Sequence, residues 1–183
     1  MATIKTIEDA REFVKKVKIC TIFPSAKTRH PSLYAHVDLP EKRPGDAGWG
    51  ARMEAVWPWK NRLPLDYPSE IYYGKIKGGF AVLMDMSYLE ATHFPEAHRP
   101  VNALSQLARW IHEKIRVEPW TTTDLRNAII RERGCSRSQF DNALKDLQIS
   151  LNVVRALDSE QDTWVTFQEV YPDIWNKYVS KEN

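Results

Sequence analysis

The spacing of apolar and polar positions predicts one helix and one β-hairpin in the first half of the chain. Apolar side chains recur at helical spacing from Thr6 to Val17, and Thr6 and Asp9 have the spacing of an N-terminal capping box. Farther along, Ile71 to Ile76 and Phe80 to Met84 are β-prone runs joined by a Lys-Gly-Gly turn. Such a turn favours close antiparallel pairing of the two runs.

The connections between these elements read as mostly irregular. Ile19 to Phe23 is a short apolar run, Leu33 to Val37 fits one helical turn, and Asp38 to Trp49 is a surface loop rich in Pro, Gly and charge. A longer apolar stripe then predicts a helix from Val101 to Val117, which Pro119 ends.

The stretch from Trp120 to Phe167 predicts two helices followed by a second hairpin. A cap signal places the start of the first helix near Thr122, and Gly134 is the residue type that commonly closes a helix. Ser136 and Gln139 form a second capping box. The buried stripe of the second helix would consist of Phe140, Ala143, Leu144, Leu147 and Leu151.

Two β-prone runs follow the second helix, Asn152 to Ala156 and Thr163 to Phe167, with a polar turn between them. Two helices and a hairpin in this order are typical of a winged helix-turn-helix. We therefore expect an α+β protein whose C-terminal third is a winged helix packed on a body of helix and hairpin. A short closing helix is expected from Tyr171 to Val179. The N-terminal portion would span residues 1–100 and the winged-helix portion residues 101–183, together forming one compact domain.

The distribution of charge along the chain argues against strong DNA binding. The net charge is only +2, and residues 1–100 carry 15 Lys or Arg against 12 Asp or Glu, whereas residues 101–183 carry 11 against 12. The half that contains the predicted winged helix is thus the less basic half, although phosphate contacts dominate the affinity of most DNA-binding proteins.

The candidate DNA-contacting residues lie at the start of the second helix. Arginine can pair with guanine, and Asn or Gln with adenine, at the position where major-groove readers usually lie. The alternative is that Gln139 only caps its own helix and that Arg137 is a solvated charge offset by Asp141. The candidate nucleic-acid-binding residues are Arg137, Ser138, Gln139 and Asn142, with Arg126 and Arg155 beside them.

A broader basic strip is a second candidate, but an ordinary charged face is the favoured interpretation. Its members would be Arg116, Arg126, Arg131, Arg133 and Arg155, with Glu118, Asp124 and Glu132 near them. The predicted wing is acidic, because it contains Asp158, Glu160 and Asp162. Like charges repel, so this wing suits a basic protein surface or solvent better than phosphates.

The Trp57-Pro58-Trp59-Lys60 motif has three interpretations. Its indoles could stack a base while Lys60 and Arg62 meet phosphates, or line a small-molecule pocket with polar groups nearby. The third and favoured interpretation is that both Trp side chains anchor the hairpin, with Lys60 over an indole face. The candidate pocket residues are Glu54, Trp57, Trp59, Lys60, Tyr73, Lys75 and Asp85.

No pattern typical of a metal, cofactor or membrane protein is found. The five His residues are scattered, no phosphate-binding Gly-rich loop is present, and Cys20 and Cys135 do not form a paired motif. We therefore expect no metal and no cofactor. The opening MATIKTIEDA lacks the apolar run of a signal peptide, and no segment approaches a membrane span, so a cytoplasmic protein is expected.

Three passages resemble a known family. They are FPSAKTRHPSLYAHV (Phe23 to Val37), VWPWKNRLP with YYGKIKGGFAVLMDM (within Val56 to Met86), and FDNALKDLQISLNVVRA (Phe140 to Ala156). They are similar to winged-helix proteins related to the AlkZ-like alkylpurine DNA glycosylases, over about Phe13 to Trp175. The resemblance implies a winged-helix α+β body in nucleic-acid repair or regulation.

The true glycosylases share a Gln-apolar-Gln or Gln-apolar-Asp catalytic motif, which orients water and stabilises positive charge on the sugar. The one matching spacing here, Gln139 and Asp141 around Phe140, falls in a predicted helix cap. The leading hypothesis is therefore a non-catalytic winged-helix protein that binds nucleic acid weakly, or a protein partner. Alternatives are a base-excision enzyme with its site beside Trp59, and a protein-interaction module that uses the acidic wing.

Overall fold

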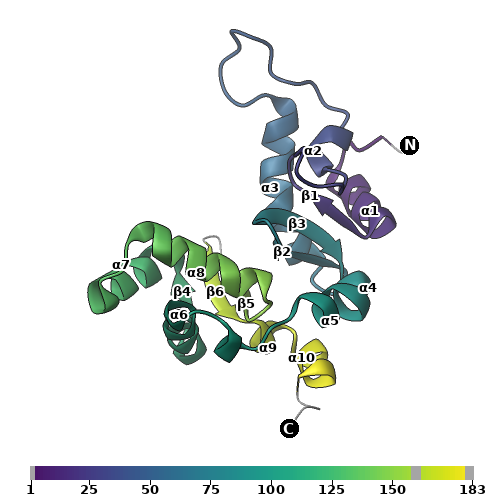
Figure 1. The fold of residues 1–183 in the computed structure, drawn as a ribbon. Coiled ribbons are helices and arrows are strands. Elements are labelled where there is room, and N and C mark those ends of the chain that lie inside the picture. Colours follow the sequence, from purple (N-terminus) through teal and green to yellow (C-terminus); the bar gives the residue numbers. More distant parts are fainter. Residues whose placement is uncertain (1–2, 158–161, 180–183) are drawn as a thin grey trace. The chain divides into compact units, whose positions relative to one another are not determined.

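A computed structural model describes residues 3–157 and 162–179 of the chain (Figure 1). Its contacts divide the chain into two compact units. The first unit comprises Met1–Tyr73 and Phe80–Leu89, and the second comprises Gly74–Gly79 and Glu90–Asn183. Each unit contributes helices and a small sheet, so the predicted α+β class is confirmed.

The first unit packs helices around a three-stranded sheet in the order β1-β3-β2. β1 and β3 are antiparallel, with Ile19 opposite Met84. The predicted helix near the amino terminus and the predicted hairpin strands are confirmed, the helix beginning at the Thr6/Asp9 capping box. The elements are α1 (Ile7–Val17), β1 (Ile19–Thr21), α2 (Leu33–His36), α3 (Ala51–Asp66), β2 (Ile71–Ile76), β3 (Phe80–Asp85) and α4 (Met86–Tyr88).

Ion pairs tie α1 to the residue that precedes β2. Arg11 Nη2 donates to Glu70 Oε1 at 2.8 Å, and Lys15 Nζ donates to Glu70 Oε2 at 2.7 Å. Hydrogen bonds from Lys15 and then Arg11 lower the pKa of Glu70, because they stabilise its charged form.

Helix α3 is the longest described element that the sequence pattern did not predict. Pro58 and Pro64 lie inside it, and proline normally interrupts a helix because it has no N–H to donate to the fourth residue before it. Val56 and Leu63, seven residues apart and fully buried, hold one face of α3 in the core of the first unit. Tertiary burial therefore outweighs the two missing hydrogen bonds, and the Trp57-Pro58-Trp59-Lys60 motif is helical.

The second unit contains two helices and a hairpin in the predicted order. Its sheet has the strand order β4-β6-β5 and is antiparallel throughout. This arrangement is compatible with a winged helix. The elements are α5 (Phe94–Ala97), α6 (Gln106–Val117), β4 (Trp120–Thr121), α7 (Thr122–Arg133), α8 (Arg137–Ile149), β5 (Val153–Arg155), β6 (Thr163–Thr166), α9 (Phe167–Val170) and α10 (Pro172–Tyr178). A π-helical segment (Leu89–His93) and a 3₁₀ turn (Val101–Ala103) complete the described elements.

The local signals around α7 and α8 behave as predicted. Thr121 accepts a hydrogen bond from the Asp124 amide, and Gly134 closes α7 in the left-handed conformation with φ of 65°. Ser136 and Gln139 form the reciprocal capping box that starts α8. The predicted closing helix also exists as α10, where Ile174 is buried.

The helix predicted from Val101 begins later, at Gln106, so the predicted boundary is wrong. Ser105 is the N-cap and its hydroxyl accepts from the Ala108 amide. Leu104 lies before the helix and is still buried in the core of the second unit. A side chain ahead of a helix can thus continue its apolar stripe, which is why the periodicity overestimated the helix.

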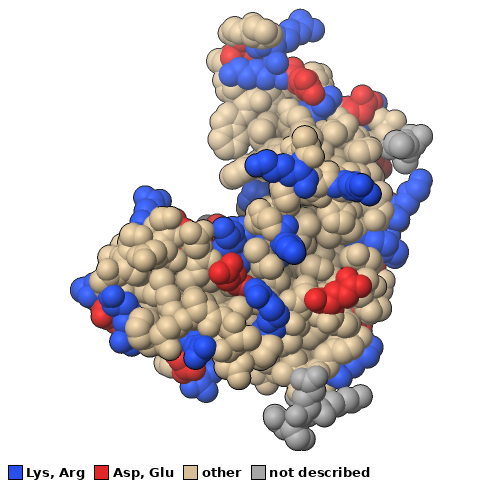
Figure 2. Space-filling model, in the orientation of Figure 1, with Lys and Arg blue, Asp and Glu red and all other residues tan. Residues whose placement is uncertain are grey.

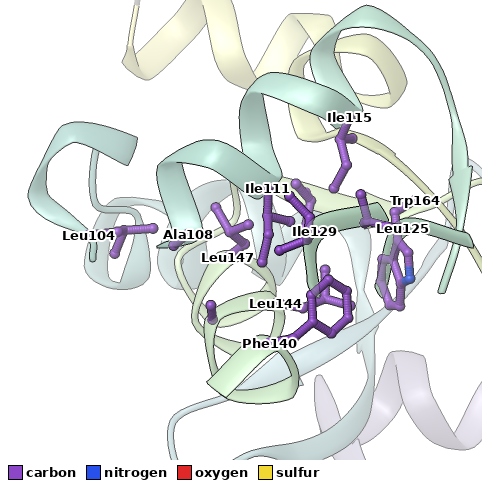
Figure 3. Packing of buried hydrophobic residues seen from close by; sticks show 12 residues of the cluster. Leu104, Ala108, Ile111, Ile115, Leu125, Ile129, Phe140, Leu144, Leu147 and Trp164 are labelled. Atoms are coloured by element: carbon purple, nitrogen blue, oxygen red, sulfur yellow. The ribbon is translucent and has the colours of Figure 1, made fainter. Parts of the chain in front are cut away.

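The core of the second unit joins α6, α7, α8 and the sheet (Figure 3). Phe140 and Leu144 of α8 lie close to Trp164 of β6 in this view, and the Trp164 indole Nε1 donates to Thr122 Oγ1 at 2.8 Å. The indole thereby holds the hairpin against the start of α7. The buried cluster contains Leu104, Ala108, Ile111, Ile115, Leu125, Ile129, Phe140, Ala143, Leu144, Leu147, Val153 and Trp164.

Candidate nucleic-acid interface

The exposed first turns of α8 hold most of the predicted DNA-contacting residues. The Arg137 side chain is 74% exposed, and Ser138, Gln139 and Asn142 are exposed as well. The apolar stripe through Phe140 faces the core, so helical geometry turns the remaining positions outward. These four residues therefore form an accessible polar surface on the second unit.

Asp141 neutralises much of the positive charge at this surface. Its Oδ1 accepts from Arg126 Nη2 at 3.0 Å, and its Oδ2 lies 3.9 Å from Arg137 Nε. Arg126 is only 19% exposed, and its guanidinium lies 5.6 Å from the Phe140 ring centroid. Arg126 is thus engaged in contacts within the second unit. Of the two arginines beside Asp141, Arg137 is the one that can reach a ligand.

The two amide side chains already make hydrogen bonds within the protein. Gln139 Oε1 accepts from the Ser136 amide at 2.8 Å, as the capping interpretation predicted, and Asn142 Oδ1 accepts from Lys145 Nζ at 2.9 Å. Each amide uses its oxygen in these bonds. Their NH₂ groups are the donors that a ligand acceptor could engage.

Arg155 and the predicted wing lie at the hairpin. The Arg155 side chain is 12% exposed, and its Nε lies 2.9 Å from Asp162 Oδ1. An arginine that is so buried and paired contributes little to binding a phosphate. Asp158 and Glu160, the other predicted wing carboxylates, lie outside the described residues.

The basic strip is largely paired with acidic residues or aromatic rings. Arg116 Nη2 lies 2.8 Å from Glu113 Oε2, and the Arg133 guanidinium lies over the Trp110 ring. Beside the strip, Lys114 Nζ lies 2.9 Å from Glu132 Oε1. The hydrogen bond from Lys114 lowers the pKa of Glu132. Figure 2 shows acidic side chains among the basic ones on the visible face. An ordinary charged face accounts for these residues better than a continuous cationic track.

A cleft of about 550 Å³ opens in the second unit between α6 and the α7–α8 turn. Its lining includes Trp110, Cys135, Gln139 and Asn142, and the guanidinium of Arg133 lies 4.2 Å from the Trp110 ring centroid. The cleft therefore adjoins the polar surface of α8. The sequence pattern did not reveal it, because the lining residues come from helices that are far apart along the chain.

The Trp-Pro-Trp-Lys motif lies on α3 in the first unit. Lys60 Nζ lies 4.3 Å from the Trp57 ring centroid and 5.7 Å from that of Tyr73, so these three predicted residues are brought together. Trp59 packs against the core of the first unit, and Glu54 is exposed on the same helix. The position of Lys60 over the Trp57 indole is the contact expected from the favoured interpretation, in which both Trp side chains anchor the hairpin.

The surroundings of Lys75 and Asp85 differ from those of the pocket roles that the sequence predicted for them. Lys75 belongs by its contacts to the second unit, and burial lowers its pKa. Asp85 is 6% exposed and caps α4, where its carboxylate accepts from the Tyr88 amide and lies 3.3 Å from Lys18 Nζ. Burial alone would raise the pKa of Asp85, but hydrogen bonds from Ser87, Tyr88 and Lys18 hold it below its usual value.

Two aromatic residues outside the predicted set join Trp57. Its ring stacks near Phe23 at 6.4 Å between centroids and meets Trp49 edge-on at 5.7 Å. Trp49 and Trp57 are 58% and 43% exposed, which is unusual for large aromatic side chains. The one sequence signal for Trp49 was an isolated aromatic between two glycines in a charged loop.

The described residues contain neither a candidate membrane-spanning helix nor a candidate metal-binding cluster. No helix among them is both long and apolar enough to cross a bilayer. Within the same residues, no group of three or more His, Cys, Asp or Glu side chains has the geometry of a metal site.

The elements of the two units define an α+β protein with two small antiparallel sheets. The second unit, in which α8 carries the exposed polar surface, is compatible with a winged helix. The model of the AlkZ-related family matches residues 4–163, so the chain belongs to that family. This membership confirms the family relationship that the three sequence passages indicated. No curated protein and no solved structure matches the chain.

Proposed function

We propose that this protein acts in DNA repair or its regulation, without catalysis, through a winged helix that binds double-stranded DNA weakly. The observation that carries the proposal is the exposed start of α8, where Arg137 is 74% exposed and Ser138 and Asn142 stand beside it. Membership of the AlkZ-related family supports the setting.

The contacts of the arginines support weak rather than tight binding. Arg126 and Arg155 are 19% and 12% exposed and pair with Asp141 and Asp162. Each phosphate that a protein neutralises contributes to both the affinity and its salt dependence. With Arg137 as the principal available cation of the group, the salt dependence should be shallow.

The test is a fluorescence-anisotropy titration of a labelled duplex at increasing salt. Arg137→Ala should weaken binding and reduce the slope of log K against log salt by about 0.9, the value for one phosphate contact. Lys16→Ala is the charge-matched control, because Lys16 is exposed on α1 in the first unit. Absence of salt-dependent duplex binding by the unmodified protein, or equal losses in both variants, would contradict the proposal.

Two alternative functions stay predictions. A base-excision site beside the Trp-Pro-Trp-Lys motif requires release of a modified base that fails in Glu54→Gln or Asp85→Asn. Asp85 also caps α4, so Asp85→Asn needs a thermal-unfolding control. A protein partner at the wing requires a pull-down that fails when the charges of Asp158, Glu160 and Asp162 are reversed.

A further inference from the structure

Four aromatic side chains of the first unit form one continuous group, which we call the aromatic surface: Phe23, Tyr34, Trp49 and Trp57. The Phe23 ring lies 5.8 Å from Tyr34 and 6.4 Å from Trp57, and Trp57 lies 5.7 Å from Trp49. Trp49 is the most exposed large apolar residue of the group, at 58%. Phe23 and Tyr34 are half-buried, so Trp49 and Trp57 form the exposed part of the group, and exposed apolar patches often mark binding sites.

The loop that carries Trp49 is held in place by specific contacts. Arg52 Nε donates to the Leu39 carbonyl at 2.9 Å, and the Arg52 amide donates to the Pro40 carbonyl at 3.2 Å. Gly50 has φ of 83°, and a Cβ there would lie 2.9 Å from the Lys42 backbone nitrogen. This close approach requires glycine, so the backbone next to Trp49 is fixed by the loop's own packing.

The segment that carries the aromatic surface contains more basic than acidic residues. Lys60 Nζ lies 4.3 Å from the Trp57 ring centroid, and the Arg52 guanidinium lies 5.4 Å from the Tyr34 centroid. Residues 23–62 carry seven Lys or Arg against four Asp or Glu. One of these acidic residues, Glu41, is paired with Arg52. Exposed cations of the segment are Lys27, Arg29, Lys42, Arg43 and Arg62, of which Arg62 is paired with Asp66 at 2.8 Å.

Exposed indole faces together with cations fit a polyanion whose bases are unpaired. Bases in a duplex are stacked on each other and cannot present their faces, whereas single strands stack freely on aromatic side chains. We propose that the aromatic surface binds single-stranded nucleic acid. Trp49 is the principal stacking platform, because Lys60 covers part of Trp57, and the surrounding Lys and Arg side chains contact the phosphates. This site is separate from the duplex site proposed on α8.

The experiment measures binding of labelled oligo(dT) and oligo(U), and of a duplex of equal length, to the full chain at increasing salt. Trp49→Ala should weaken oligo(dT) binding at least about fivefold, since stacking of one base is commonly worth that much. Trp49→Phe should retain part of the affinity. Leu65→Ala is the matched control, because Leu65 is a 50% exposed apolar residue on α3 outside the aromatic surface.

A second measurement guards against loss of fold in the variants. The quenching of tryptophan fluorescence that oligo(dT) causes in the unmodified protein should be largely absent in Trp49→Ala. The thermal unfolding midpoint of this variant should stay unchanged. Arg137→Ala should leave oligo(dT) binding intact, which separates this proposal from the duplex proposal. The inference is overturned if neither oligonucleotide binds, if the duplex binds this surface as tightly as oligo(dT), or if Trp49→Ala and Leu65→Ala bind oligo(dT) equally.

Discussion

Asp141→Asn should strengthen duplex binding, because Asp141 holds the one well-exposed arginine of the predicted DNA-contacting group. Arg137 Nε lies 3.9 Å from Asp141 Oδ2. At about 4 Å, opposite charges attract by ~1 kcal/mol in bulk water, and exposed pairs commonly contribute ~0–1 kcal/mol. Releasing Arg137 should therefore tighten duplex binding by at most about fivefold. Asparagine keeps the side-chain shape and an acceptor oxygen for Arg126.

The salt dependence should reveal how many arginines are released. Arg137, at 74% exposed, can turn toward a phosphate, whereas Arg126 is 19% exposed and packs near Phe140. Because Arg137 already makes one phosphate contact in the proposed complex, its release should tighten binding with little change in the slope of log K against log salt. A new phosphate contact by Arg126 would instead steepen the slope by about 0.9. The structure predicts little change in the slope.

Anisotropy titrations of Asp141→Asn, Asp173→Asn and the unmodified protein provide the test. Asp173 is exposed on α10, so Asp173→Asn makes the same change in net charge at another helix. The double variant Arg137→Ala/Asp141→Asn should lose the gain entirely. Equal changes in duplex affinity for Asp141→Asn and Asp173→Asn, or a gain that survives in the double variant, would contradict this prediction.

Three further predictions concern stability and are checked by urea unfolding. Gly50→Ala should destabilise the protein more than Gly45→Ala: both glycines have positive φ, which costs a non-glycine residue ~1–2 kcal/mol, but only the Cβ at Gly50 meets backbone, at 2.9 Å. Asn152→Ala should cost ~1–3 kcal/mol, because it removes a buried donor to the Arg99 carbonyl at 2.9 Å; an unchanged midpoint would contradict this. Burial lowers the pKa of His112 below its ordinary 6.5, so the neutral imidazole is favoured in the folded state. The free energy of unfolding should then decrease as pH falls below that value, and His112→Leu should remove this part of the pH dependence.

Local signals account for most of what was predictable about the fold. The Thr6/Asp9 and Ser136/Gln139 capping boxes and the helix-closing Gly134 act within a few residues. A sequence window therefore contains all the atoms that make these contacts. The α8 stripe through Phe140 was equally predictable, since one buried helix face imposes a regular spacing on the chain.

Helix α3 and the ion pairs at the α8 surface depended on the tertiary structure. Pro58 and Pro64 argue locally against a helix, and only burial of residues such as Leu63 reverses that preference. The sequence also could not show that Asp141 serves Arg126, fifteen residues away, as well as its helical neighbour Arg137.

The same division holds for the aromatic surface. The placement of Trp57 and Lys60 in one motif, and the helix caps, apolar stripes and turns of an α+β fold, can be read from the sequence alone. The meeting of Phe23 and Trp49 with Trp57 follows from the fold, because Phe23 is far from Trp57 in the sequence and the loop of Trp49 is positioned by its contacts with Leu39 and Pro40. Contacts between distant residues follow from the packing of whole elements, which no short window of sequence contains.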